Sequence, residues 1–172
     1  ESAAALAYEQ AVAWYGHALA LLPPDAGGFL EAELLIQRGE ASLAAGDVPG
    51  ARETFRQAAA VARESGDVER LARAALGLGS GTAGFDVPVW DQGHVALLEE
   101  ALAALGSSLG ALRAQVQARL AVALWVTGDD DRRRMLSDEA VAVAREIGDE
   151  AVLASALAAR CVVIAGPAFA AV

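Results

Sequence analysis

Apolar residues recur every three or four positions along most of the chain, which is the period of one face of an α-helix. Glycine, proline and Gly-Asp pairs interrupt this pattern at short intervals and mark the ends of its segments. The pattern therefore predicts an all-α fold with short connections. Helices are expected at residues 2–22, 29–45, 49–65, 68–79, 93–106, 109–127, 131–147 and 149–164.

One stretch of the chain repeats at an offset of 82 residues. The sequence Ala-Val-Ala-Arg-Glu-x-Gly-Asp occurs at 60–67 and again at 142–149, and Gly-Asp pairs begin at positions 46, 66, 128 and 148. Glycine ends a helix at low cost because it tolerates the left-handed conformation, and the aspartate then caps the next helix. The offset suits two helical hairpins of about 34 to 45 residues each.

Helices joined by such short turns pack as antiparallel pairs, and a pair that cannot bury its apolar face alone stacks on its neighbours. We therefore expect residues 1–172 to form a single helical-repeat domain. The chain starts within a helical pattern and without an initiator Met, which suggests a fragment of a longer protein. One long loop is expected at about residues 80–93, which contain Gly, Pro and Asp and lack a helical period.

Small and aromatic residues stand at the spacings of a known repeat, in which the second helix of each pair has a small residue, then an aromatic one, then another small one. The matching residues are Ala11, Tyr15, Ala18 and Pro23 in one pair and Ala51, Phe55 and Ala58 in the next, with the small Gly39 on the preceding helix. The match weakens later, where Ser137 replaces the aromatic residue and Arg133 a small one. The chain thus resembles degenerate tetratricopeptide repeats, which implies antiparallel helix pairs stacked as a right-handed solenoid.

Longer phrases carry a narrower resemblance. Stretches such as GDVPGARETFRQAAAVARESGDVERLARAALGLG and AVAREIGDEAVLASALAAR resemble the helical-repeat region of large actinobacterial regulators, and the likeness extends over residues 6 to 165. These regulators include ATP-dependent LuxR-type activators and related NTPase-containing proteins, with the NTPase before the repeats and the DNA-binding part usually at the C-terminal end. The resemblance implies a cytoplasmic regulatory arm that does not itself read DNA.

Composition excludes several classes of function. The chain has 23 acidic and 13 basic residues, for a net charge of −10, and every basic residue is arginine. A chain without lysine cannot carry a P-loop, and an acidic chain is a poor partner for nucleic acid. The single Cys161 rules out a disulfide scaffold. Residues 151–172 are apolar enough to suggest a membrane span, but Arg160 lies near their centre, so no span is expected.

We expect no catalytic, cofactor or metal site. Residues 79–84 match G-x-G-x-x-G, but a helical pattern comes before them and no helix follows, so they do not form a dinucleotide fingerprint. His17, His94 and Cys161 stand on three separate elements, unlike paired zinc ligands. Residues 129–134 read Asp-Asp-Asp-Arg-Arg-Arg and are expected to start a helix, with the arginines solvated or paired to nearby acids.

The best candidate for a functional surface is the groove of the predicted array, which the first helix of each pair lines in tetratricopeptide proteins. The register set by Gly39 and by the offset of 82 gives as groove residues Glu33, Ile36, Glu40, Leu43, Gln115, Val122 and Trp125. This set is partly apolar and partly acidic, which favours an apolar or basic peptide segment. Trp125 is large enough to anchor such a partner, although it could equally pack against a neighbouring repeat.

The long loop offers a second candidate surface, because long connections in compact repeats often carry function. Its candidate contact residues are Phe85, Trp90 and His94. They could reach a partner, or the aromatic rings could fold back between helices.

Three functions stay open. The leading one is a non-catalytic protein-interaction scaffold that binds a protein, a peptide or neighbouring domains of its parent chain. The second is an effector-binding or enzymatic domain with a small-molecule pocket near residues 80–94. The third is self-association, for example as a homodimer, through the apolar C-terminal stretch at 162–172.

Overall fold

The computed structural model describes residues 2–23, 26–79, 91–106 and 110–165. Its secondary structure is helical, with no strand in those ranges, so the all-α prediction is confirmed. Each predicted helix is present close to its expected bounds. The elements are α1 (Ser2–Ala20), α2 (Gly28–Ala44), α3 (Val48–Ser65), α4 (Val68–Leu78), α5 (Gln92–Leu105), α6 (Gly110–Ala123), the 3-10 helix η1 (Leu124–Thr127), α7 (Asp130–Ile147) and α8 (Glu150–Ala165).

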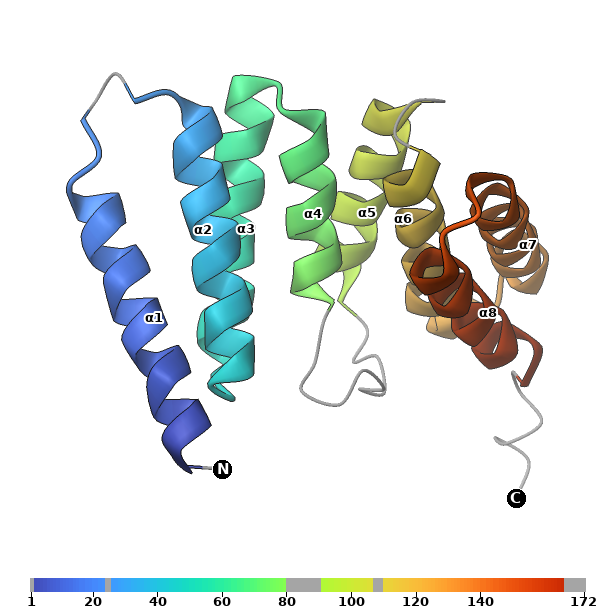
Figure 1. Cartoon of the computed structure of the whole chain (residues 1–172). Coiled ribbons are helices and arrows are strands. Elements are labelled where there is room, and N and C mark those ends of the chain that lie inside the picture. The colour runs from blue at the N-terminus through green and yellow to red at the C-terminus, as the bar shows by residue number, and fades with distance from the viewer. Residues whose placement is uncertain (1, 24–25, 80–90, 107–109, 166–172) are drawn as a thin grey trace. The chain divides into compact units, whose positions relative to one another are not determined.

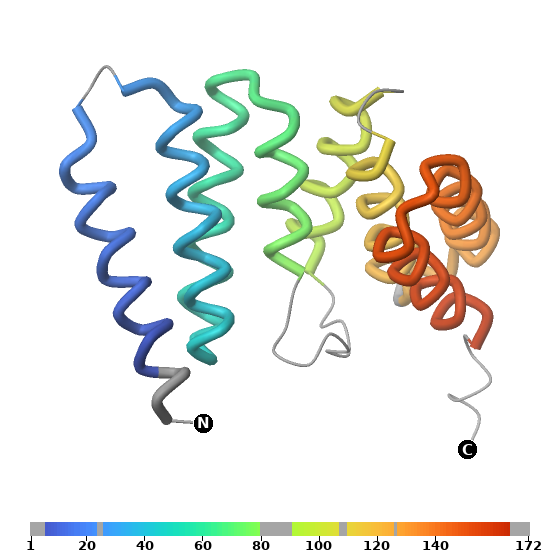
Figure 2. Tube along the Cα trace, viewed as in Figure 1, coloured from blue at the N-terminus to red at the C-terminus, as the bar shows by residue number. Residues whose placement is uncertain are grey.

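The chain divides into two compact units, where the sequence predicted a single domain. Unit 1 is Glu1–Val87 and unit 2 is Pro88–Val172. In unit 1, α2 packs against α1, α3 and α4, and α3 packs against α4. In unit 2, α6 packs against α5, α7 and α8, and α7 packs against α8. Consecutive helices run in opposite directions within each unit (Figures 1 and 2), as expected for helical hairpins.

The Gly-Asp pairs end one helix and begin the next, as the sequence predicted. Gly66 and Gly148 adopt positive φ angles of 69° and 74° after α3 and α7. Asp67 Oδ1 accepts the backbone N–H of Arg70 at 3.0 Å, which caps α4. The pairs that begin at positions 46 and 128 behave in the same way, with φ angles of 87° and 72° and an aspartate that caps the following helix.

The offset of 82 residues also relates the helices of the two units. Adding 82 to the bounds of α3 gives the bounds of α7, and adding it to the first residues of α2 and α4 gives those of α6 and α8. The burial pattern repeats as well. The buried positions of α3 are 51, 54, 55, 58, 59 and 62, and those of α7 are 133, 136, 137, 140, 141 and 144, each 82 higher. Units 1 and 2 therefore contain two copies of one three-helix layout.

Phe55 fills the centre of the three-helix layout in unit 1. Its side chain is 1% exposed, and its ring lies over the backbone of two glycines, one on α2 and one on α4. A Cβ atom built at Gly39 would lie 2.8 Å from Phe55 Cζ, and one built at Gly77 would come closer still to the same ring. Both glycines are needed because any side chain there would occupy the space of the ring.

Unit 2 fills the same layout with different side chains. Ser137 occupies the place of Phe55, Arg133 that of Ala51, and Gln117 that of Leu35, and all three unit 2 side chains are buried. The positions of the two glycines hold Ala121 and Ala159. The core of unit 2 thus lacks the aromatic ring and contains a long charged side chain one turn earlier on α7.

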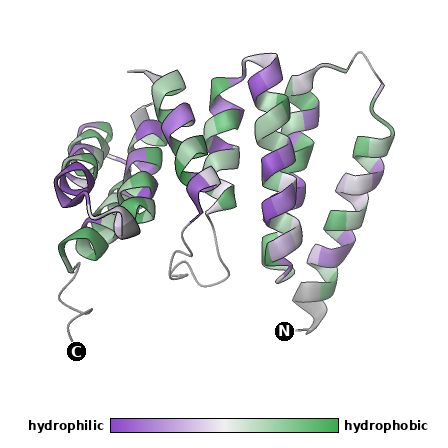
Figure 3. Ribbon diagram, turned by 180° about the vertical axis from the view of Figure 1, so that it is seen from behind, coloured by the Kyte–Doolittle hydropathy of each residue, from purple (hydrophilic) through white to green (hydrophobic). Residues whose placement is uncertain are grey.

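The helices at the two ends of the described chain expose apolar residues. On α1, Trp14 is 72% exposed, and Leu21 just beyond the helix is 83% exposed. On α8, Leu157 and Ile164 are exposed, and Figure 3 shows the part of this helix next to the C-terminus as mostly hydrophobic. No helix among the described residues is long and apolar enough to cross a membrane.

Candidate functional site

The predicted groove residues of α2 divide between core and surface. Ile36 is 1% exposed and packs in the core of unit 1, so its side chain is not available to a ligand. Glu33 and Leu43 are half-buried, and Glu40 is exposed. The surface part of this patch is therefore Glu33, Glu40 and Leu43, which lie along α2 at helical spacings.

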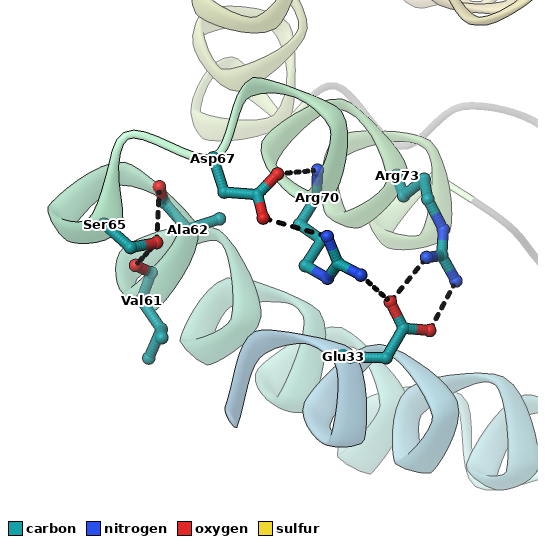
Figure 4. Close-up of polar contacts among 7 residues, drawn as sticks. All are labelled: Glu33, Val61, Ala62, Ser65, Asp67, Arg70 and Arg73. Carbon is teal, nitrogen blue, oxygen red and sulfur yellow. Dashed lines mark hydrogen bonds and ion pairs between the residues drawn. The ribbon is translucent and has the colours of Figure 1, made fainter. Parts of the chain in front are cut away.

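Glu33 joins α2 to α4 through two arginines (Figure 4). Its Oε2 lies 2.7 Å from Nη1 of Arg73 and 2.9 Å from Nη2 of Arg70, and its Oε1 accepts from Nη2 of Arg73 at 3.1 Å. The bond to Arg73 is bidentate, which is the stronger geometry for an arginine and a carboxylate. This carboxylate therefore holds two helices of unit 1 together.

Arg70 has two further partners at the same end of the unit. Its Nη1 lies 2.9 Å from Oδ2 of Asp67, the residue that caps α4. Its guanidinium carbon lies 3.4 Å from the centroid of the Phe29 ring, a cation–π contact. Phe29 is nevertheless 59% exposed, so the cluster presents an aromatic surface next to an arginine whose Nε is buried without a hydrogen-bond partner among the described residues.

The ion cluster shifts the acidities of its members in opposite directions. The hydrogen bonds from Arg73 lower the pKa of Glu33, and the same contact raises the pKa of Arg73. Partial desolvation raises the pKa of Glu40; Arg73 opposes this shift and Glu33 adds to it. Glu33 is thus held as a fixed anion, whereas Glu40 is a carboxylate that would gain from a cationic neighbour.

In unit 2 the equivalent patch carries no charge. Gln115 and Val122 on α6 are half-buried, and Trp125 in η1 is 37% exposed. These residues stand 82 positions after Glu33, Glu40 and Leu43. The two patches occupy the same register of the layout, but one is acidic and the other is neutral and aromatic.

Arg133 lies beneath the patch of unit 2, and sequence analysis did not identify it as part of a site. It was expected to be solvated or paired within an Asp-Asp-Asp-Arg-Arg-Arg run, but its side chain is 2% exposed. Its Nη1 donates to Asp130 Oδ1 at 2.9 Å, its Nε donates to the carbonyl oxygen of Ala121 at 3.2 Å, and its Cζ lies 5.6 Å from the centroid of the Trp125 ring. The sequence feature that could have identified Arg133 is its position, where the repeat has a small residue.

Of the three predicted loop contacts, the structure describes His94 alone. Phe85 and Trp90 lie outside the described residues, as does most of the G-x-G-x-x-G stretch. His94 is 8% exposed near the start of α5, where its backbone N–H donates to Oδ1 of Asp91 at 3.1 Å. Within the described ranges, no three His, Cys, Asp or Glu side chains gather in a way that could hold a metal ion.

Comparison with known proteins identifies no relative of this chain. No family model matches it, and no curated protein matches it.

Proposed function

We propose that the chain is a non-catalytic protein-interaction module of the tetratricopeptide type, acting as a cytoplasmic regulatory arm of a larger transcriptional regulator. The observation that carries this proposal is the repetition of one three-helix layout in both units, whose central helices α3 and α7 bury the same positions at an offset of 82 residues. Repeated helical layouts offer their partners extended surfaces rather than a single convergent pocket.

The contact surfaces in this proposal are the equivalent patches of α2 and of α6 with η1. Unit 1 contributes the exposed carboxylate of Glu40 and the apolar Leu43, and unit 2 contributes Val122 and the indole of Trp125. An apolar side chain suits the indole, and a basic side chain suits the carboxylate of Glu40, whose pKa is raised by partial desolvation. The patch of unit 1 should therefore favour a basic side chain of a partner, and the patch of unit 2 an apolar one.

A display selection of random peptides on the purified chain tests this proposal. Enriched peptides should contain apolar and basic residues, and their affinity should fall at least tenfold with Trp125→Ala, as expected for an aromatic anchor. The matched control is Trp14→Ala, which removes a more exposed tryptophan from α1. Glu40→Gln should weaken the basic peptides, whereas Glu64→Gln, at an exposed glutamate of α3, should not.

Two outcomes would contradict the proposal. One is a selection that enriches no peptide above the background of an unrelated helical protein. The other is a set of peptides that bind with unchanged affinity when both Trp125 and Glu40 are substituted.

A second candidate function is self-association, which is favoured by the exposed apolar side chains of Leu157 and Ile164 on α8. Helices with uncovered apolar faces commonly pair with a second copy. Mass measured by sedimentation over a hundredfold range of concentration should then rise, and Ile164→Ser should lower the dimer fraction. A mass that stays monomeric at the highest concentration would contradict this function.

A further inference from the structure

The end of α6 differs in helix type from the equivalent part of unit 1. α2 continues as an α-helix to Ala44, whereas α6 ends at Ala123 and the chain continues as the 3-10 helix η1 from Leu124. An offset of 82 residues places Ala44 opposite residue 126, inside η1. The same layout therefore ends its first helix in two different ways.

Arg133 makes a hydrogen bond close to the point where α6 gives way to the 3-10 helix η1. In a continuous α-helix the carbonyl of Ala121 would accept the N–H of Trp125, because the bonds join residues four apart. The Nε of Arg133 donates to that carbonyl oxygen at 3.2 Å, just before η1 begins. A side chain that bonds a helix carbonyl inserts into the ladder of i→i−4 hydrogen bonds and interrupts the regular α-helical turn for the residues that follow.

Unit 1 lacks this donor. The residue equivalent to Arg133 is Ala51, whose side chain has no polar atom, and the carbonyl equivalent to that of Ala121 belongs to Gly39. The change from alanine to arginine therefore coincides with the change from an α-helical to a 3-10 ending. Thr127 also supports the turn, because its hydroxyl donates to the Leu124 carbonyl at 2.6 Å.

The 3-10 helix η1 sets the direction in which the Trp125 side chain points. A 3-10 helix rises about 2.0 Å per residue with 3.0 residues per turn, against about 1.5 Å and 3.6 in an α-helix, so side chains that follow the change point in new directions. Trp125 is the second residue of η1 and stays 37% exposed, while the guanidinium of Arg133 lies 5.6 Å from its ring centroid. A cation beside an aromatic ring restricts the ring's movement.

We propose that Arg133 is a positioning residue: it turns the end of α6 into η1 and holds Trp125 as the aromatic anchor of the partner surface. Asp130 keeps the arginine in place through the bond to Nη1. The partner in this inference rests on the proposed function, whereas the control of the turn by Arg133 is a property of the chain alone.

The wild-type protein provides a first test. By nuclear magnetic resonance, the Nε–H of Arg133 should exchange slowly with water and show a scalar coupling across the hydrogen bond to the Ala121 carbonyl. The exposed Arg145 near the end of the same helix supplies the internal reference for fast exchange. Fast exchange of the Arg133 Nε–H together with the absence of the coupling would overturn the inference.

Arg133→Met provides the second test, since methionine fills a similar space without a donor or a charge. The Cα chemical shifts of residues 124–126 should move toward α-helical values, and the fluorescence maximum assigned to Trp125 should shift. Arg134→Met, the same substitution at the next position, should change neither. Unchanged shifts and fluorescence in a folded Arg133→Met protein would overturn the inference.

Peptide affinity separates this inference from the function on which it rests. For peptides selected on the wild-type chain, Arg133→Met should weaken binding about fivefold to tenfold, less than Trp125→Ala. If the turn changes but these peptides bind Arg133→Met as tightly as wild type, the positioning role is wrong and the proposed function survives. If no peptide binds wild type while the turn depends on Arg133, the proposed function fails and the control of the turn stands.

Discussion

The central helices of units 1 and 2, α3 and α7, bury the same positions and fill them in opposite ways. In unit 1 the large side chain is Phe55 and the position one turn earlier holds Ala51. In unit 2 the large side chain is Arg133 and the position one turn later holds Ser137. A close-packed core tolerates such an exchange only if a gain in volume at one site offsets the loss at the other.

The side chains that fill the two cores have different consequences for the surface above each core. The ring of Phe55 requires glycines on α2 and α4 and donates no hydrogen bond, so α2 continues as a regular helix. The buried guanidinium of Arg133 needs acceptors for its N–H groups. Its Nε donates to the Ala121 carbonyl near the end of α6. The difference shows how a degenerate repeat can keep its fold while it changes the local backbone beneath a binding patch.

The largest expected effect is at the aromatic core of unit 1. Phe55→Ala should lower the free energy of unfolding by about 3–5 kcal/mol, because it removes a buried ring and leaves a cavity. The matched change in unit 2, Ser137→Ala, should cost less than about 1 kcal/mol, since its hydroxyl bonds only to the Arg134 carbonyl of the same helix. Urea unfolding curves measure both, and equal losses would contradict the contrast between the cores.

The glycine under the ring gives the next largest effect. Gly39→Leu should lower stability by about 1–3 kcal/mol because the new side chain would overlap Phe55, and Ala58→Leu should act similarly at a fully buried position of α3. In unit 2, Ala121→Gly should cost only about 0.5–1 kcal/mol, the ordinary penalty for glycine in a helix. Thermal unfolding tests this, and unchanged melting temperatures for Gly39→Leu and Ala58→Leu would mean that the repeat register is misplaced.

The next largest effect on stability is expected at the ion cluster of unit 1, and this effect should depend on pH. Glu33→Gln should cost about 1–2 kcal/mol at pH 7, because it leaves Arg70 and Arg73 without their shared carboxylate. The folded pKa of Glu33 is lowered, so its contribution is complete above the unfolded value of about 4.3 and is lost as pH falls through the folded value.

The stability difference between wild type and Glu33→Gln should therefore shrink as pH falls below about 4.3. Glu31→Gln, at an exposed glutamate of the same helix, is the control and should behave as wild type throughout. A stability gap between wild type and Glu33→Gln that stayed constant down to pH 3 would show that the carboxylate charge is not what joins α2 to α4.

The smallest effect on stability is expected at the helix caps, and it should be the same in units 1 and 2. Asp47→Ala and Asp129→Ala should each cost about 1 kcal/mol, because each aspartate accepts a backbone N–H at the start of the central helix of its unit. Hydrogen exchange on α3 and α7 measures the two losses separately. A loss confined to one unit would show that the Gly-Asp turns are not equivalent.

Much of this fold could be predicted from the sequence because its signals are local. The Gly-Asp pairs fix where helices end and begin, and the period of apolar residues fixes which face is buried. The repeat register marked Gly39 and Ala58 as small positions, and both are buried in the structure. The boundary between the two units, after Val87, lies in the stretch of residues 80–93 for which the sequence predicts a long loop.

The candidate site was harder to predict because it depends on burial and pairing. Glu33 was correctly expected at the surface of α2, but its bonds to Arg70 and Arg73 join residues about 40 positions apart, which no spacing rule reveals. Ile36 was assigned to the groove by register alone, and the structure places it on the buried face of α2. Arg133 looked like one of three solvated arginines, because a buried arginine is rare and its acceptor is a backbone carbonyl.

The most direct test is a double-mutant cycle in the core of unit 2, carried out in an Ala121→Gly/Ala159→Gly background that provides the two glycines of unit 1. Arg133→Ala alone should leave a cavity, and Ser137→Phe alone should overpack a space that the arginine still fills. If the two cores are alternative fillings of one layout, the two changes together should recover stability, with a favourable coupling above about 1 kcal/mol. Effects that add to within about 0.5 kcal/mol would contradict the account.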